Sequence, residues 1–379
     1  MCGTPKTLGV LVLSGMVAAT VPKPPMTTAL ASPIAFREKA PEPLFGEGLP
    51  PASALLLQAR IKDLRLHLAG TRLEKFIHQL YVELEAAGIS HRPECYLSDQ
   101  WGCPSGVPVI GIPFYLADSN LLQIEDALGA GAESERDIMM YLRHEAGHAF
   151  NYAYKLYETE EWTRLFGDFG KPYLDTYKPQ PFSRKYVAHL SGWYAQKHPD
   201  EDFAETFAVL LTPASNWAER YKGWGALKKL QYMQDVITRV GRTTPPVTLG
   251  ERDMDVAQME ETVLDHYRQR ALEEKIDLSI GDQLDQDLVA LFEPESVGST
   301  GADTLLRAER QSMIHAVTQY SGVSRGVVKS VLDHLLERVT VLKVTVHRDK
   351  AREYTTKLTV LLTTLAMNFL YTDKFFDAD

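Results

Sequence analysis

Residues 134–154 read Ser-Glu-Arg-Asp-Ile-Met-Met-Tyr-Leu-Arg-His-Glu-Ala-Gly-His-Ala-Phe-Asn-Tyr-Ala-Tyr and contain the clearest pattern in the chain. Ser134 and Asp137 have the spacing of a capping box, which predicts that a helix begins here. Within this helix His144 and His148 are four residues apart, so their side chains project from one face, about one turn from each other. Two imidazoles in this arrangement can bind one metal ion.

Glu145 lies between the two histidines, on the adjoining face of the same helix. From there its carboxylate can contact a water on the metal instead of the metal itself, as a general base must. The pattern H-E-x-x-H therefore indicates a catalytic zinc site. The alternative is an ordinary helix with two histidines at its surface or in its core.

A catalytic zinc ion takes three protein ligands and keeps one position open. The segment His198-Pro-Asp-Glu-Asp-Phe-Ala-Glu-Thr-Phe-Ala208 is predicted to be helical and places Glu201 and Glu205 on one face. We assign Glu201 as the third ligand, and Glu205 as the acceptor that orients a ligand histidine, His144. Two alternatives stay open: the two glutamates could exchange roles, or the acidic first turn could merely complement the helix dipole.

These motifs resemble the gluzincin arrangement of the lethal-factor and Pro-Pro endopeptidase type. More closely, residues 144–211 are similar to bacterial proteins classed as putative zinc-binding metallopeptidases, and the resemblance extends over about 95–267. It implies a zincin-like fold and one zinc ion. In the lethal-factor pattern a tyrosine seven residues before the ligand glutamate stabilises the oxyanion, and that position is Tyr194 here. Thermolysin-like enzymes commonly have aspartate where this chain has Glu205, so the resemblance supports the orienting role of Glu205 less strongly than the other assignments.

The segment Val107–Phe114 reads as a strand, and Pro108 and Pro113 within it lack an amide hydrogen, which favours the edge of a sheet. An exposed edge can pair with an extended peptide, so we expect this strand to hold a substrate across the metal. A purely structural edge is the alternative. Cys95 and Cys103 do not have the spacing of a zinc site, and we expect a disulfide or two packed thiols.

The rest of the sequence indicates how the chain is divided into domains. Its 379 residues suggest about two domains. Apolar spacings of three and four predict helices, and alternation predicts a strand over 339–346; the main helical stretches are 55–68, 73–84, 200–211, 221–240 and 327–339. Pro245-Pro246 marks the predicted boundary, which gives a flexible N-terminal segment or weak signal peptide over 1–35, a catalytic domain over 36–244 and a helical region over 245–379.

Composition excludes several classes of protein. There are 40 Lys and Arg residues against 50 Asp and Glu residues, a formal net charge of −10, which argues against a nucleic-acid partner. No apolar run is long enough for a membrane helix. The apolar stretch 8–17 has the order of a weak signal peptide, so export is an alternative to the favoured cytoplasmic location.

The sequence thus predicts an α+β protein, mostly helical with a small sheet, whose zincin-like domain is followed by a helical C-terminal region. We expect a zinc-dependent peptidase acting on a peptide or protein, with one Zn2+ bound by His144, His148 and Glu201 and with Glu145 and Tyr194 as catalytic residues. A non-catalytic zinc-stabilised binding protein and a zinc hydrolase with a non-peptide substrate are the alternatives.

Overall fold

The computed structural model describes residues 49–127, 133–174, 177–273, 280–292 and 298–375. The predicted N-terminal segment 1–35 therefore lies outside the described residues. Within them the chain is mostly helical and has two two-stranded sheets, β1–β2 and β3–β4. The α+β class with a small sheet is thus confirmed at this coarse level, with a second small sheet in the C-terminal region.

The elements of the first part of the chain run in the following order: α1 Pro51–Leu56, η1 Ile61–Leu64, α2 Arg72–Ala86, β1 Glu94–Ser98, β2 Val109–Pro113, η2 Phe114–Ala117, α3 Ser119–Ala127, α4 Glu135–Ala153, η3 Leu156–Glu158, α5 Glu160–Phe166, η4 Ser191–Gln196, α6 Pro199–Leu211, α7 Trp217–Arg220, α8 Leu227–Val240, η5 Val256–Gln258 and α9 Val263–Glu273. The C-terminal elements follow: α10 Asp285–Leu291, β3 Ser299–Gly301, α11 Ala302–Ser321, α12 Arg325–Leu342, β4 Thr345–His347, η6 Arg348–Lys350 and α13 Ala351–Thr372.

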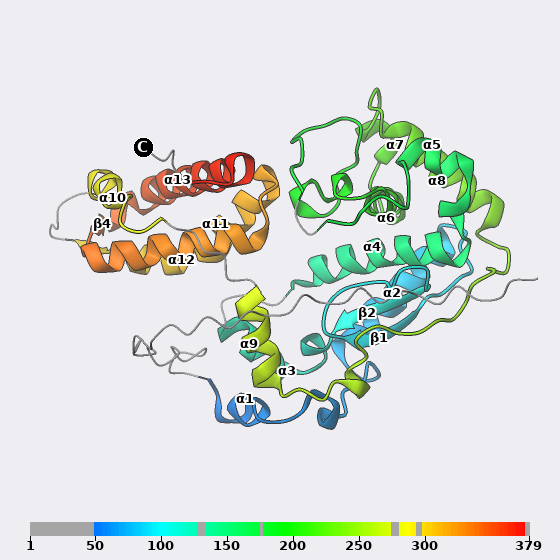
Figure 1. Ribbon diagram of the computed structural model, residues 1–379, viewed down its shortest axis with the longest axis horizontal. Coiled ribbons are helices and arrows are strands. Elements are labelled where there is room, and N and C mark those ends of the chain that lie inside the picture. The colour runs from blue at the N-terminus through cyan, green and yellow to red at the C-terminus, as the bar shows by residue number, and fades with distance from the viewer. Residues whose placement is uncertain (1–48, 128–132, 175–176, 274–279, 293–297, 376–379) are drawn as a thin grey trace, which may run out of the picture. The chain divides into compact units, whose positions relative to one another are not determined.

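Helix α4 forms the centre of the first part. The Ser134 side chain accepts the amide hydrogen of Asp137, and the Asp137 carboxylate accepts that of Ser134, so the predicted capping box is confirmed. Every residue from Leu142 to Ala153 is buried, because α6 covers one side of the helix while α2 and β2 cover the other (Figure 1). Both histidines of the motif are therefore inside the protein.

Helices α4 and α6 approach each other closely at Gly147. A Cβ atom built on Gly147 would lie 2.8 Å from the Ala204 Cα and 2.9 Å from its carbonyl oxygen. Such distances are well inside van der Waals contact, so only glycine fits at this point of α4. The close approach brings the first turns of α6, with Glu201 and Glu205, against the histidines of α4.

The strand predicted over 107–114 is present as β2, but the prediction that it offers an exposed edge is wrong. All five residues of β2 are buried. One edge pairs in parallel with β1, and on the other edge Gly111 exchanges two backbone hydrogen bonds with Gly102, of 2.7 and 3.3 Å. The segment around Gly102, and not β2 itself, therefore forms the outer edge.

Among the described residues, the buried hydrophobic side chains form two large cores and one small cluster around Tyr221. The first contains side chains from Ile61 to Tyr267, and it includes Val256, Met259 and Val263, which follow the predicted boundary at Pro245. The second contains side chains from Ile280 to Phe375. Both cores belong to one compact unit of the chain.

Two predicted elements are wrong in their extent. The helix expected over 55–68 ends at Leu56, because Arg60 is extended and forms a bridge with Thr262, a tertiary contact that overrides the local periodicity. The strand expected over 339–346 is helix in its first half, since α12 continues to Leu342, and β4 covers Thr345–His347.

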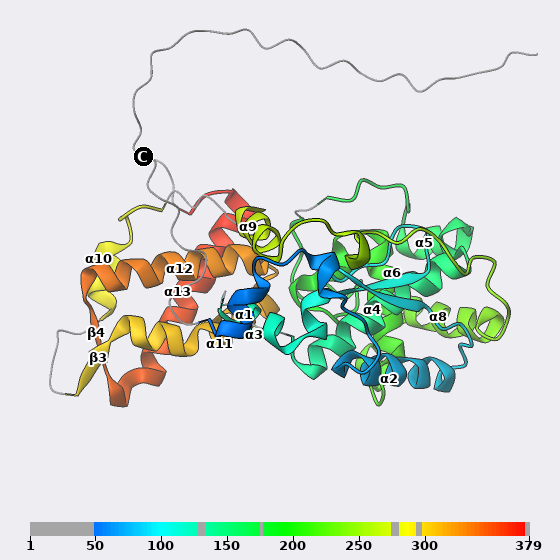
Figure 2. The same ribbon diagram turned by 90° about the horizontal axis from the view of Figure 1, so that it is seen from below.

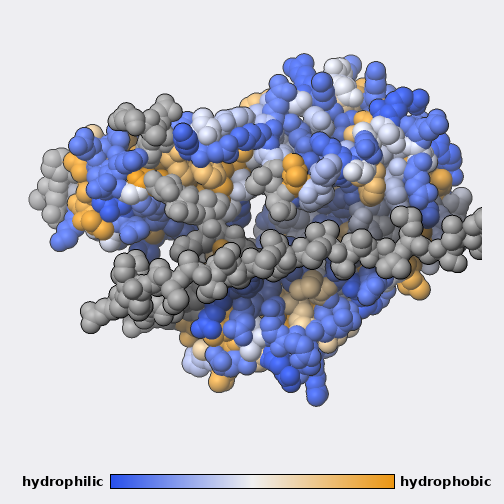
Figure 3. All heavy atoms as spheres, in the orientation of Figure 1, coloured by the Kyte–Doolittle hydropathy of each residue, from blue (hydrophilic) through white to orange (hydrophobic). Residues whose placement is uncertain are grey.

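The C-terminal region consists of α11, α12 and α13 lying side by side, with α10 against α12 (Figure 2). Gly322, which ends α11, lies against η4: a Cβ built on it would be 2.6 Å from Pro179 Cγ and 3.1 Å from Trp193 Cδ1. The face drawn in Figure 3 is mostly hydrophilic, with small hydrophobic patches over the C-terminal helices. Among the described residues, no helix combines the length and the apolar character needed to cross a membrane.

Candidate metal centre

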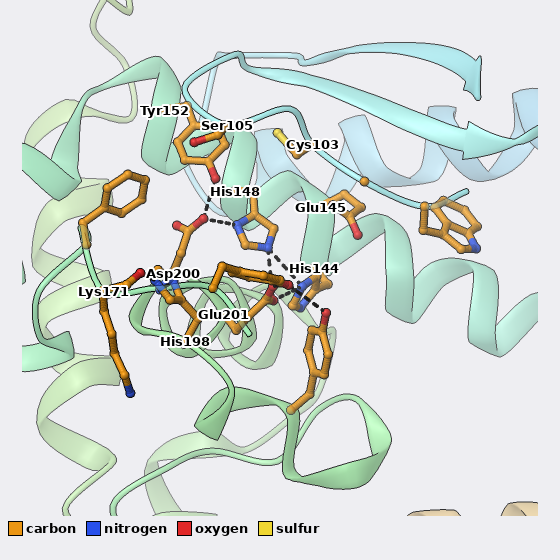
Figure 4. Close-up of a pocket in the computed structure, with 15 residues that line it drawn as sticks. Cys103, Ser105, His144, Glu145, His148, Tyr152, Lys171, His198, Asp200 and Glu201 are labelled. Carbon is orange, nitrogen blue, oxygen red and sulfur yellow. Dashed lines mark hydrogen bonds and ion pairs between the residues drawn. The ribbon is translucent and has the colours of Figure 1, made fainter. Parts of the chain in front are cut away.

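The two motifs meet in one cavity. It is lined by α4, by the start of α6, and by the segments that contain Trp101–Ser105, Phe169–Tyr173 and Tyr194 (Figure 4). Helix α6 begins after His198, whose Nδ1 accepts the amide hydrogen of Asp200, and proline follows at the first helical position. This cap and the proline fix where α6 begins, and its first turn then faces the histidines of α4.

His144, His148 and Glu201 converge on one point of this cavity. The Nε2 atoms of the two histidines are 3.1 Å apart, and Glu201 Oε2 lies 2.9 Å from the first and 3.3 Å from the second. All three residues are buried, and together they form a group of ligand atoms that could hold a metal ion. The structure thus brings together the three residues predicted as ligands.

Each histidine is oriented through its other ring nitrogen. Nδ1 of His144 lies 2.9 Å from Glu205 Oε1, and Nδ1 of His148 lies 3.0 Å from Asp200 Oδ2. Glu205 is fully buried and also accepts the amide hydrogens of His189 and Leu190. This arrangement favours Glu205 as the orienting acceptor and Glu201 as the ligand over the exchanged roles.

The donor set fits a zinc ion. An ionised carboxylate only accepts hydrogen bonds, so both Nδ1 atoms donate, and in the neutral imidazoles an unshared electron pair is then left on each Nε2. Two such pairs and one carboxylate oxygen then face each other within 4.8 Å. They repel one another unless a cation lies among them, and two imidazoles with one carboxylate are ligands that zinc takes in catalytic sites.

The charges of the site lead to the same conclusion. Burial alone would lower the pKa of His144, but hydrogen bonds to Glu201 and Glu205 raise it to about 9. Burial opposes ionisation of Glu201 as well, yet the charge of His148 and its contact with His144 hold the pKa of this carboxyl well below its usual range. The carboxylates therefore create a field that attracts positive charge, whether protons or a metal ion.

Glu145 lines the same cavity. It is buried, and burial raises its pKa above the usual value. Within the part of the chain that the structure describes, its carboxylate makes no hydrogen bond or ion pair, and no dashed line reaches it in Figure 4. A carboxylate in this position is free to exchange a proton with a molecule in the cavity.

Tyr194 also reaches the site, from the kinked helix η4. Its ring centroid is 5.5 Å from that of His144. Its backbone follows Gly192 and Trp193, both with positive φ, of 80° and 57°. Burial and the nearby charge of Glu201 raise the pKa of the Tyr194 phenol, so it keeps its hydrogen and can donate it.

Sequence reasoning missed two residues of the site. Asp200 belongs to the acidic first turn of α6, for which the sequence offered only the helix dipole, but it is buried and accepts hydrogen bonds from His148, Tyr152 and Asn151. Tyr173 donates a 2.5 Å hydrogen bond to Glu201. The position of Asp200 directly before the proposed ligand Glu201 was a usable signal in the sequence. Tyr173 has no such signal, because it lies in a loop.

The other candidates have structural contacts. His189 and His198 also lie near the proposed ligands, but they contact the carbonyl oxygens of Met140 and Lys171 through Nε2, both at 2.9 Å. Cys95 and Cys103 are free cysteines rather than a disulfide. Burial raises the pKa of the Cys95 thiol to about 12, so it packs as a neutral group.

The comparison with known families agrees with this geometry. Residues 112–240 match the family model described as "Putative zinc-binding metallo-peptidase", and this range includes both motifs. No curated protein and no solved structure matches the chain significantly. Over residues 112–240, which contain the buried group His144, His148 and Glu201, the chain is therefore similar to putative zinc-binding metallopeptidases.

Proposed function

We propose that this chain is a zinc-dependent peptidase with a zincin-like catalytic domain, which hydrolyses peptide bonds in a peptide or protein substrate. One observation carries the proposal: the converging atoms of His144, His148 and Glu201 line the same cavity as the unpaired carboxylate of Glu145. A structural metal site needs its ligands but has no use for a free carboxylate beside them.

His144, His148 and Glu201 would hold the ion, and Glu205 and Asp200 orient the two imidazoles. When bound, zinc supplies Lewis acidity, which polarises a peptide carbonyl and makes a water more acidic. The protein contributes a buried site whose ligands are already oriented, so little reorganisation is needed at the time of reaction.

Glu145 and Tyr194 perform the proton chemistry in this proposal. Glu145 takes a proton from the attacking water and later passes it to the nitrogen of the leaving amine. Tyr194 donates its phenolic hydrogen to the oxyanion that forms at the attacked carbonyl. Both residues line the cavity that contains the ligand group.

The segment Trp101–Cys103 is the edge that we propose for the substrate, in place of β2. Gly102 directs both its amide hydrogen and its carbonyl oxygen to Gly111. In an antiparallel pair the neighbouring residues then direct theirs to the opposite side, and Trp101 and Cys103 line the cavity. An extended peptide could add to this edge through its main chain, which favours a peptide over a non-peptide substrate.

The test compares wild type with Glu145→Gln for zinc content and for cleavage of a diverse peptide library. We expect the variant to retain zinc and to lose cleavage by a factor of at least about 100, because the general base is removed while the ligands remain. Glu160→Gln, at an exposed glutamate of α5, is the matched control and should behave as wild type.

The outcomes separate the proposal from its alternatives. A wild-type protein that binds zinc and cleaves no peptide of the library would indicate a non-catalytic zinc protein. A wild-type protein that binds no zinc would overturn the proposal. Cleavage by Glu145→Gln at the wild-type rate would refute the role of Glu145.

A further inference from the structure

We propose that Tyr173 is a positioning residue of the metal centre, whose hydroxyl fixes both the ligand carboxylate of Glu201 and the phenol of Tyr194. The inference rests on the proposed function and assigns to this site a residue that neither motif contains. Tyr173 lies between the two motifs in sequence, in the stretch that connects α5 to η4.

The contact with Glu201 involves the carboxylate oxygen that does not face the histidines. Glu201 Oε2 lies near both Nε2 atoms, whereas Oε1 accepts a 2.5 Å hydrogen bond from the Tyr173 hydroxyl. The two oxygens of the carboxylate therefore have separate partners. Engaging Oε1 keeps Glu201 turned so that only Oε2 is directed at the ligand group, which helps to leave a position open for substrate.

The contact with Tyr194 follows from the same hydrogen. A phenol has one hydrogen to donate, and Tyr173 donates it to Glu201, which can only accept. The Tyr194 oxygen lies 3.3 Å from that of Tyr173, so in this pair Tyr194 is the donor. Hydrogen bonds thus run from Tyr194 to Tyr173 and from Tyr173 to Glu201. The phenolic hydrogen of Tyr194, which we propose as the donor to the oxyanion, is therefore kept near the ligand group before substrate binds.

Two contacts with its ring hold the Tyr173 side chain in place although it is 51% exposed. Lys197 Nζ lies 4.3 Å from its ring centroid, and the His198 ring centroid lies 5.3 Å from it. His198 also ties the loop to α6: its Nδ1 accepts the amide hydrogen of Asp200, so its Nε2 carries the hydrogen and donates it to the Lys171 carbonyl at 2.9 Å. The loop is therefore attached to the helix that carries Glu201.

The test uses the full chain and three readouts on Tyr173→Phe. A chelator competition should show a zinc dissociation constant raised about 10-fold or more, the usual effect of losing a hydrogen bond to a metal ligand. The visible spectrum of the cobalt-substituted protein should change, because Glu201 is free to turn its second oxygen inward. With a library peptide that wild type cleaves, kcat should fall by about 10-fold or more while KM changes little.

Tyr177→Phe is the matched control. Tyr177 lies in the same stretch and its hydroxyl donates a 2.7 Å hydrogen bond to the Gly192 carbonyl, but it does not contact Glu201. This variant should leave the zinc affinity and the cobalt spectrum unchanged. Circular dichroism and thermal unfolding of both variants check that each is folded.

The results distinguish this inference from the proposed function. If Tyr173→Phe has the zinc affinity and cobalt spectrum of wild type, or if Tyr177→Phe changes them equally, the positioning role is refuted while the peptidase proposal stands. If wild type itself does not bind zinc, both are overturned.

Discussion

The close approach of α4 and α6 leads to a prediction for Gly147→Ala. The added methyl group would lie 2.8 Å from the Ala204 Cα, whereas carbon atoms in contact are about 3.5 to 4.0 Å apart. The two helices must therefore separate locally by roughly 1 Å. Because Gly147 lies between Glu145 and His148 in the motif, this separation acts directly on the metal centre.

Two effects on stability oppose each other. Alanine in a helix interior is favoured over glycine by about 1 kcal/mol, and forcing an extra methyl group into a packed core costs about 1 to 3 kcal/mol. We therefore expect the free energy of unfolding without zinc to fall by roughly 0 to 2 kcal/mol. Zinc affinity should fall much more, because ligand distances tolerate only about 0.2 Å and the helices must move by several times that.

The assay combines urea unfolding of the zinc-free protein with a chelator competition for zinc. Gly326→Ala is the matched control, since Gly326 lies in α12 and a Cβ there would meet nothing within 4 Å. That variant should be as stable as wild type or slightly more stable, with unchanged zinc affinity. The reasoning is refuted if Gly147→Ala binds zinc as tightly as wild type and is no less stable than Gly326→Ala.

Two further predictions address the supports of the site. Asp200→Asn removes the charge that orients His148, and we expect zinc affinity to fall by about 10- to 100-fold in the same competition; an unchanged affinity would show that Asp200 does not orient the ligand. Gly322→Ala would displace η4, which carries Tyr194, and should lower kcat by on the order of 10-fold with zinc retained. Gly281 also has a positive φ, but a Cβ atom there would meet nothing within 4 Å, so Gly281→Ala should lower the stability of the protein and leave kcat unchanged. Equal kcat values for Gly322→Ala and Gly281→Ala would contradict the proposed displacement of η4.

Part of the site could be predicted because it is periodic. The spacing of His144 and His148 fixes their common face once the helix exists, and Ser134 fixes where that helix begins. The same spacing rule places Glu201 and Glu205 on one face of α6. These relations hold within one helix, so they need no knowledge of the rest of the fold.

Other parts could not be predicted, because they depend on which elements meet. The two prolines near β2 correctly indicated an edge in this part of the chain, but the isolated bridge between Gly102 and Gly111 covers that strand, and no local pattern marks the bridge. Likewise, the bridge of Arg60 to Thr262 ends a helix that its apolar spacing favours. Long-range backbone pairing prevailed over local propensity in both places.

The sequence by itself determined that two helices each present a pair of side chains suited to bind or orient a metal ligand, since helical geometry relates residues four apart. Only the tertiary structure decided that these pairs face each other across Gly147, that Asp200 orients His148, and that Tyr173 contacts Glu201. The physical reason is that the distance between helices and the path of a loop are set by packing among residues far apart in the chain, for which no sequence period exists.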